Sequence, residues 1–394
     1  MVKKIKELQK PDGPFNIGRV HLNFVDKNRI DPFPLAKGKN RDVPVIIWYP
    51  IDKSNNSHRL RLIKRQDLKS LKALSLYKLI PKRLCEILTN SYEDAIISDR
   101  VSNFPLLIFN HGFSSFMEQN TLLMEHLTSY GYIVASVGHP YDGVASYPDG
   151  RSIPMDVKIF KSSKKKLRKK MKIALGIMKN LETENLTIEE IKKYTENYSV
   201  YTENYGSYGI EIWIDDIIFI TNILEKMNKG SFNSQFTQKI AFDKGVGVFG
   251  HSLGGAASIF SCCLDNRLKC GINMDGTMFG GLKEKYKYNK PYMYMNCDWL
   301  ANMNKYFYHI NTNDSYYLTV KDSKHGDYSD GTYLLKNWFK KLAPTYGKID
   351  GNQMIKIANN YVQAFFDKYI KGIDSPVLNS NPYDEVILEK KTKK

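Results

Sequence analysis

The chain has 394 residues, of which 42% are hydrophobic, and its 58 Lys and Arg against 41 Asp and Glu give a formal net charge of +17. That length suits one large core with insertions, and the sequence holds no run of about 20 apolar residues that would predict a membrane-spanning helix. Residues 1–10 are basic but lack the apolar segment of a signal peptide, so we expect a cytoplasmic protein.

Strand-like segments open the chain, and a leucine-rich stretch follows them. Residues 18–24 and 43–49 have the β-branched and aromatic composition of strands. Leucines recur at helical spacing over 64–91, and Pro81 interrupts them. This pattern predicts two amphipathic helices, and we expect 55–100 to be a helical insertion.

Strands and helices then alternate along the chain. Residues 105–109 and 132–137 predict strands, with a helix over 118–130 between them. A further helix over 210–229 leads to the strand at 245–249. Such alternation favours an α/β protein with a mainly parallel sheet flanked by helices.

A basic segment interrupts this alternation, and we expect 151–210 to form a helical cap. Apolar side chains at helical spacing in this segment alternate with many lysines. The lysines are Lys158, Lys161, Lys164, Lys165, Lys166, Lys169, Lys170 and Lys172. A basic amphipathic helix either covers a pocket with its apolar face or lies on an anionic membrane, and the cap is the preferred interpretation. No motif that reads nucleic acid accompanies it, so we expect no nucleic-acid partner.

The most informative motif is VGVFGHSLGG at 246–255, where an apolar strand runs into a glycine-rich turn. Gly250, Ser252 and Gly254 form the G-x-S-x-G pattern of a nucleophile elbow, in the strand–turn–helix context that the motif requires. The two glycines let the strand and the helix approach closely. We therefore predict that Ser252 is a catalytic nucleophile rather than a structural serine in a turn.

The chain order of an α/β-hydrolase, the fold in which this motif occurs, predicts where the base lies. The acid and then the histidine follow the nucleophile, and of the eight histidines only His309 and His325 lie beyond Ser252. His309 precedes the strand-like run 316–320, whereas His325 follows it. A loop leaving the last strand is where the base belongs, so His325 is the predicted base, and a solvated loop histidine is the alternative.

Two aspartates compete for the acid that orients this histidine. The acid has to be held rigidly, which favours a strand end. Asp275 ends the strand-like segment 270–274, and Asp298 ends the segment 291–297. The residues alone leave the two assignments nearly even.

Backbone N–H groups are predicted to stabilise the oxyanion. One belongs to Leu253, directly after the nucleophile, and the other to the loop that follows an earlier strand. Asn110-His111-Gly112-Phe113 fits that loop, with Phe113 as the donor. We expect His111 to shape the loop rather than to move protons.

These residues, with others along the chain, resemble the platelet-activating factor acetylhydrolase family, meaning the plasma and type II intracellular enzymes and their bacterial relatives. The matching stretches are 13–18 (GPFNIG), 26–33 (DKNRIDPF), 45–50 (VIIWYP), 109–113 (FNHGF), 250–256 (GHSLGGA), 273–276 (NMDG) and 361–369 (YVQAFFDKY). The resemblance implies one α/β-hydrolase domain over 1–394, Asp275 as the acid and Phe113 as an oxyanion donor. Residues 55–100 and 151–210 match poorly, and in such folds these regions cover the substrate pockets.

The function that these patterns predict is a serine ester hydrolase that needs neither cofactor nor metal. The cysteines, Cys85, Cys262, Cys263, Cys270 and Cys297, have neither disulfide nor zinc spacing. By resemblance the substrate is a short-acyl ester, small or lipid, such as a platelet-activating-factor-like or oxidised phospholipid. A dienelactone-hydrolase-like carboxylesterase acting on soluble esters is one alternative, and a non-catalytic membrane-binding module is another. The sequence does not indicate an oligomeric state.

Overall fold

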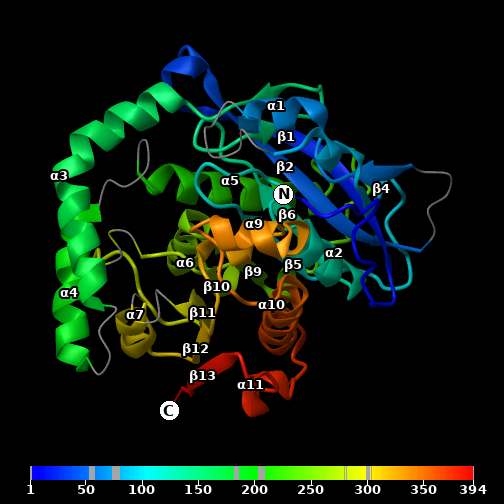
Figure 1. Ribbon diagram of the computed structural model, residues 1–394. Helices are drawn as coiled ribbons and strands as arrows, with labels where there is room; N and C mark the ends of the chain where they lie inside the picture. The colour runs from blue at the N-terminus through cyan, green and yellow to red at the C-terminus, as the bar shows by residue number, and fades with distance from the viewer. Residues whose placement is uncertain are drawn as a thin grey trace.

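One large sheet forms the centre of the protein. The computed structural model describes residues 2–52, 58–72, 80–181, 186–202, 209–278, 280, 282–298, 302 and 304–393. The strands of the sheet in these ranges are β1 (Asn16–Ile30), β2 (Asn40–Ile51), β3 (Arg59–Arg61), β4 (Leu88–Glu93), β5 (Leu106–Asn110), β6 (Ile133–Val137), β9 (Val246–His251), β10 (Leu268–Met274), β11 (Tyr292–Cys297), β12 (Ser315–Val320) and β13 (Val386–Lys391). Their order across the sheet is β13-β12-β11-β10-β9-β5-β6-β2-β1-β4-β3 (Figure 1).

The middle of this sheet is parallel, as the sequence predicted. Strands β6, β5, β9, β10, β11 and β12 are parallel to one another, whereas β2 and β13 pair with their neighbours in the antiparallel sense. Asn110, the last residue of β5, lies opposite Gly250 of β9, and Met274, the last residue of β10, lies opposite His251. The carboxyl ends of these strands therefore meet at one edge of the sheet, where open α/β sheets bind ligands.

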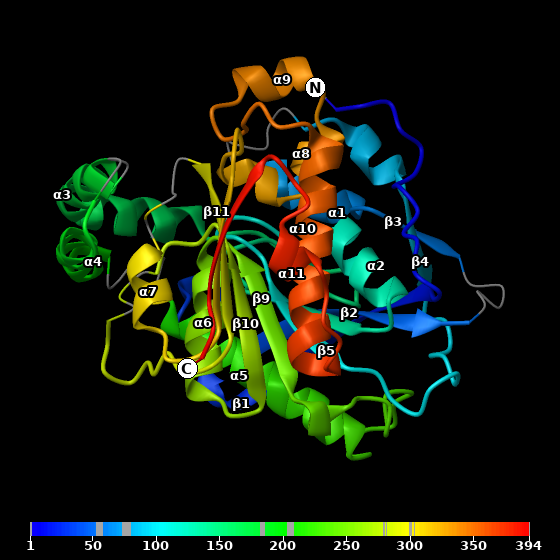
Figure 2. The ribbon, with the colours of Figure 1, turned by 90° about the horizontal axis from the view of Figure 1, so that it is seen from below.

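Each face of the sheet carries its own layer of helices. The helices are α1 (Arg65–Lys72), α2 (Thr121–Ser129), α3 (Val157–Leu181), α4 (Ile188–Thr202), α5 (Glu211–Asn228), α6 (Leu253–Leu264), α7 (Lys305–Ile310), α8 (Gly331–Leu334), α9 (Asn337–Leu342), α10 (Gly351–Phe366) and α11 (Val377–Ser380). Alternate residues of a strand point to opposite faces. Ile46 and Trp48 of β2 thus pack in one core with α2 and α10, while Val45 and Ile47 pack in the other with α5 and α6 (Figure 2).

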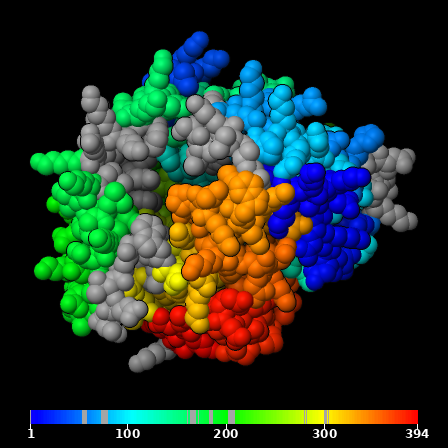
Figure 3. All heavy atoms as spheres, in the orientation of Figure 1, coloured from blue at the N-terminus to red at the C-terminus, as the bar shows by residue number. Residues whose placement is uncertain are grey.

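Helices α3 and α4, which we call the cap pair, lie at one side of the sheet. They pack on each other, and α4 also packs on α7. Figure 3 shows them along one flank of the molecule, across from the N-terminal segment. Of the side chains that the structure describes in α3 and α4, few are buried, among them Ala174, Leu181, Ile191 and Tyr198. The segment 151–210, expected to be a helical cap, contains helices at 157–181 and 188–202.

The segment 64–91, predicted as two helices, is only partly helical. Helix α1 matches the first half, but after Pro81 the chain forms a short 3₁₀ helix at Lys82–Glu86 and then strand β4, which pairs with β1. The inward side chains of β4 include Thr89 and Ser91. Because these are polar, no hydrophobic alternation marked the strand in the sequence. Residues 73–79 lie outside the described ranges.

Of the helices in the described ranges, none combines the length and the apolar character that crossing a membrane requires.

Candidate active site

The turn between β9 and α6 has the geometry of a nucleophile elbow. Ser252 has a φ of +58° and a ψ of −126°, a conformation that side-chain-bearing residues rarely adopt. A β-carbon at Gly250 would lie 2.5 Å from the carbonyl oxygen of Gly254, and one at Gly254 would lie 2.3 Å from that of Asn110. Both positions therefore require glycine, and the strand–turn–helix context predicted for Ser252 is confirmed.

Ser252, His325 and Asp275 form a continuous series of hydrogen bonds. The Ser252 Oγ lies 3.0 Å from Nε2 of His325, and Nδ1 of the same ring lies 2.6 Å from Oδ2 of Asp275. An ionised carboxylate only accepts hydrogen bonds, so Nδ1 donates and Nε2 is left to accept the serine proton. The carboxylate is buried, whereas 38% of the His325 side chain is exposed.

The Asp275 carboxylate is supported from two sides. It follows β10, and its Oδ1 accepts a hydrogen bond of 2.7 Å from the backbone N–H of Cys297 at the end of β11. Burial raises the pKa of this carboxyl, but the hydrogen bond and charge of His325 and the Cys297 N–H outweigh burial, so its pKa lies below the usual range. Asp275 therefore stays ionised at neutral pH.

The competing sequence candidates lie elsewhere. Asp298 is exposed and accepts a hydrogen bond of 3.4 Å from the backbone N–H of Asp322. His309 is exposed on α7. The structure thus brings Asp275 and His325 to Ser252 and places Asp298 and His309 away from these contacts.

The loop that carries His325 is held by a buried ion pair that the sequence did not reveal. Asp327 accepts hydrogen bonds from the backbone N–H groups of Lys324 and Gly347, at 2.9 and 2.6 Å, and its other oxygen lies 3.0 Å from Nζ of Lys340. Both side chains of this pair are at most 3% exposed. Among 58 basic residues, nothing in the sequence distinguishes Lys340 as buried.

The loop after β5 lies directly against Ser252. A β-carbon at Gly112 would be 3.4 Å from the Ser252 Cβ. The Gly112 carbonyl accepts hydrogen bonds from Nδ1 of His111, at 2.8 Å, and from the backbone N–H of Ser115, at 3.0 Å. Because a trans peptide is planar, this carbonyl fixes the Phe113 N–H in the opposite direction. Burial lowers the pKa of His111 to about 3, so its ring is neutral and shapes the loop.

Leu253, the other predicted oxyanion donor, is the first residue of α6. The N–H groups in the first turn of a helix have no acceptor within the helix. Leu253 adjoins Ser252 in the chain, and Gly112, the residue before Phe113, lies against the Ser252 side chain.

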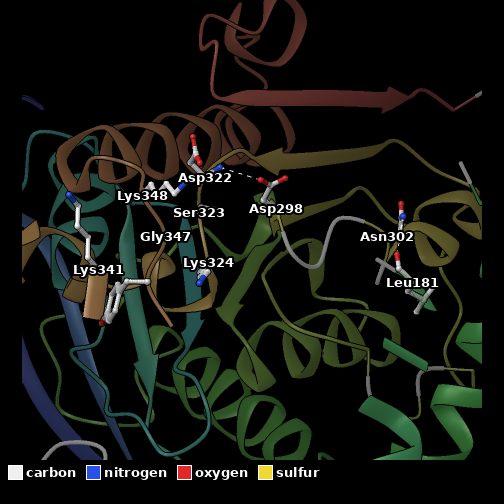
Figure 4. A pocket seen from close by; sticks show the side chains of 10 residues that line it. Leu181, Asp298, Asn302, Asp322, Ser323, Lys324, Lys341, Gly347 and Lys348 are labelled. Carbon is white, nitrogen blue, oxygen red and sulfur yellow. Dashed lines mark hydrogen bonds between the residues drawn. The ribbon is translucent and has the colours of Figure 1, made fainter. Parts of the chain in front are cut away.

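A pocket of about 540 Å³ lies beside the His325 loop (Figure 4). Its lining residues are Leu181, Asp298, Asn302, Asp322, Ser323, Lys324, Lys341, Tyr346, Gly347 and Lys348. Ser323 and Lys324 directly precede His325, and Leu181 ends α3. The cap pair therefore contributes one lining residue, Leu181, to a pocket that the segment directly before His325 also lines.

The cap pair also contacts the loop that follows β10 and carries Asp275. The hydroxyl of Tyr198 on α4 lies 3.2 Å from Oγ1 of Thr277, two residues after Asp275. Within the described ranges, no group of three or more His, Cys, Asp or Glu side chains is arranged to hold a metal ion.

A solved structure shares this arrangement of strands and helices. The chain superposes on the ferulic acid esterase from Streptomyces cinnamoneus with a TM-score of 0.71, over 97% of this chain and 99% of that one, at 21% sequence identity. With the order and directions of the strands, this likeness confirms the predicted α/β-hydrolase fold.

Sequence comparison gives the family. The chain is 28% identical to the platelet-activating factor acetylhydrolase of Bos taurus over 277 residues, which are 68% of this chain and 57% of that protein. It is 26% identical to the Cavia porcellus protein of the same name, covering 58% of it, so it spans somewhat more than half the length of both relatives. The chain matches the family described as platelet-activating factor acetylhydrolase, isoform II, over residues 2–381, and it belongs to that family.

Proposed function

We propose that the protein is a serine ester hydrolase in which Ser252 is the nucleophile, His325 the general base and Asp275 the residue that orients the base. The observation that carries this proposal is the series of contacts from the Asp275 carboxylate through the His325 ring to the Ser252 hydroxyl, at 2.6 and 3.0 Å. An imidazole so placed accepts the hydroxyl proton as the oxygen attacks. Family membership supports the same activity.

The first half of the reaction forms an acyl-enzyme. Ser252 Oγ attacks the acyl carbonyl, and its proton moves to Nε2 of His325 while Asp275 stabilises the imidazolium. The negative charge that develops on the carbonyl oxygen accepts hydrogen bonds from the N–H groups of Leu253 and Phe113. His325 then protonates the leaving oxygen, and the alcohol departs.

Water completes the reaction by the reverse route. His325 removes a proton from a water molecule, and the oxygen of that water attacks the acyl carbonyl of the acyl-enzyme. The proton returns to Ser252 Oγ as the carboxylic acid leaves. Because part of the His325 side chain is exposed, water reaches the ring from solvent.

We propose a short-acyl ester carried by an amphiphile as the substrate, of the platelet-activating-factor-like or oxidised phospholipid type. The printed names of the Bos taurus and Cavia porcellus relatives support this class. We propose that the cap pair selects among substrates, because it approaches both the loop that carries Asp275 and the pocket beside the His325 loop. We propose that the cap pair belongs to a single domain spanning 1–394. Strands β3 and β4, which lie within the proposed insertion 55–100, extend the sheet at its far edge.

Hydrolysis of nitrophenyl esters with rising acyl length tests this proposal, together with labelling by a fluorophosphonate probe. We expect turnover to fall as the acyl chain lengthens, and the probe to label the wild type but not Ser252→Ala. Esters presented as monomers and in vesicles separate the alternatives. A strong preference for soluble esters would favour a general carboxylesterase, and an unlabelled, inactive wild type would contradict the serine hydrolase itself.

A further inference from the structure

A second series of hydrogen bonds connects His325 to the loop after β5. We call this loop, 111–115, the oxyanion loop because it carries the proposed donor Phe113. The backbone N–H of Gly112 donates to Oε1 of Gln119 at 2.8 Å, and Nε2 of Gln119 lies 2.6 Å from Nδ1 of His251. Nε2 of His251 lies 3.0 Å from the backbone carbonyl oxygen of His325. Gln119 and His251 are 5% and 6% exposed, so these bonds are shielded from water.

The two ends of this series fix its direction. A backbone N–H only donates, so the oxygen of the Gln119 amide faces Gly112 and its NH₂ group donates to Nδ1 of His251. A backbone carbonyl only accepts hydrogen bonds. Nε2 of His251 therefore carries a proton and donates a hydrogen bond to the backbone carbonyl of His325. Burial, followed by the charge of His325, lowers the pKa of His251 to about 3, which keeps the ring in this neutral form at working pH.

We propose that Gln119 and His251 are positioning residues that hold the oxyanion loop and the catalytic histidine in one geometry. The inference rests on the proposed function, because it assigns roles around Ser252. His251 precedes Ser252 in the elbow, and its ring centroid lies 4.6 Å from that of His325. The neutral His251 side chain thus belongs to the turn that carries Ser252 and contacts His325. It is connected to the oxyanion loop through Gln119.

The side chains act on geometry rather than on the fold. The backbone carbonyl of Gln119 accepts a hydrogen bond of 3.0 Å from the Asp330 N–H, and the Asn120 side chain donates one of 2.9 Å to the carbonyl of Tyr328. These bonds attach the same segment to the region after His325 without the Gln119 amide. Removing the Gln119 side-chain amide therefore removes the hydrogen bonds to the Gly112 N–H and the His251 ring. The backbone of this segment keeps its hydrogen bonds to the region after His325.

The test uses Gln119→Leu, His251→Phe and the double variant. We expect kcat to fall about 10- to 100-fold in each, because misplacement of reacting groups by about 1 Å costs this order of rate. KM should stay within about twofold, since ground-state contacts are unchanged. The double variant should lose no more than the worse single variant, because both changes interrupt one series of bonds.

A conservative variant separates positioning from packing. Glutamine reaches the position of Nε2 of a histidine, so His251→Gln keeps a donor for the His325 carbonyl. We expect it to recover most of the kcat lost in His251→Phe. If His251→Phe fails to fold, the comparison of Gln119→Leu with His251→Gln still tests the proposal, because the first should lose kcat and the second should retain most of it.

The chain offers a control in another histidine–glutamine pair, which is partly buried. Nε2 of His126 on α2 lies 2.7 Å from Oε1 of Gln363 on α10. His126→Phe and Gln363→Leu should lower the melting temperature without changing kcat. Wild-type kcat in both Gln119→Leu and His251→Phe, or an equal loss in the control pair, would overturn the positioning role. An inactive wild type would instead contradict the proposed function.

Discussion

The carboxyl edge of the sheet and the cap pair are built by opposite means. At the edge, backbone atoms lie so close that Gly250 and Gly254 have no room for a β-carbon, and the polar groups of Asp275 and His251 are buried and hydrogen-bonded. The cap pair carries exposed lysines and exposed apolar groups such as Leu175, which is 53% exposed. Close packing at the edge therefore fixes the positions of the side chains around Ser252, whereas we expect the exposed side chains of the cap pair to tolerate substitution.

The largest expected effect is at the edge. Ser252→Ala removes the atom that would form the acyl-enzyme, so kcat should fall by about 10⁴ or more. The melting temperature should change little, because the side chain is small and partly exposed. Ester hydrolysis by the purified variant measures this, and activity above about a tenth of the wild type would contradict the assignment.

The next effect compares the two aspartates. Asp275→Asn should lower kcat about 10³- to 10⁴-fold, because an amide no longer holds the His325 ring in the tautomer that accepts the serine proton. Asp298→Asn is the matched control, and we expect it to keep nearly full activity because Asp298 contacts Asp322 instead. Both variants need melting temperatures close to the wild type. The opposite ranking would move the acid to the end of β11.

The residues changed in these variants differ in how well the sequence predicts them. The elbow motif singled out Ser252 by its local pattern, and the chain order of the fold singled out His325, which follows the strand-like run 316–320. Asp275 and Asp298 each end a strand, so the residues alone left the acid open. The family resemblance favoured Asp275, and the contact between Asp275 and His325 agrees with it. Gln119 has no pattern of its own, because its partners lie 7 and 132 residues away.

The strands of the sheet also differ in how well the sequence predicts them. Apolar strands such as β5 and β9 were predicted because both their faces are buried. Strand β4 was missed because its inward residues are polar, and β13 was not predicted because an edge strand rich in charge has no buried run. Sequence patterns therefore indicate elements that bury apolar surface, and they say little about polar contacts between distant segments.

A smaller effect concerns the pH dependence of stability. Burial, followed by the charge of Asp67, raises the pKa of Glu118 in the core to about 7. An unfolded chain releases this proton near pH 4.3, so the free energy of unfolding falls as the pH rises from about 4 to 7. Glu118→Gln should remove this slope and raise the melting temperature by a few degrees at pH 8 relative to the wild type, with less difference at pH 5.

Glu196 on α4 provides the control for that measurement. It is exposed on the cap pair, and exposed substitutions usually change stability by less than about 0.5 kcal/mol. Glu196→Gln should leave the melting temperature unchanged at both pH values. A pH slope that persists in Glu118→Gln but disappears in Glu196→Gln would place the titrating group in the cap pair.

The smallest effect on catalysis is expected from the lysines of the cap pair. Lys169, Lys170, Lys172 and Lys179 are exposed on α3, whereas the side chains of Lys164, Lys165 and Lys166 lie outside the described part of the chain. Changing these four lysines to Gln should leave hydrolysis of a soluble short-chain ester unchanged, because the proposed triad lies at the carboxyl edge of the sheet and not on α3.

Co-sedimentation with anionic vesicles then decides what this basic surface does. A lysine near an anionic surface contributes about 1 kcal/mol, and the attraction weakens as salt shortens the Debye length below about 10 Å. Lys27, Lys37, Lys39 and Lys82 are exposed elsewhere on the chain, so changing these four to Gln gives the same loss of charge. If α3 lies on a membrane, only the α3 variant releases vesicles at low salt. If both variants sediment like the wild type, the lysines are the solvated face of a cap. Neither set of lysines touches the proposed triad, so the esterase proposal stands in either case.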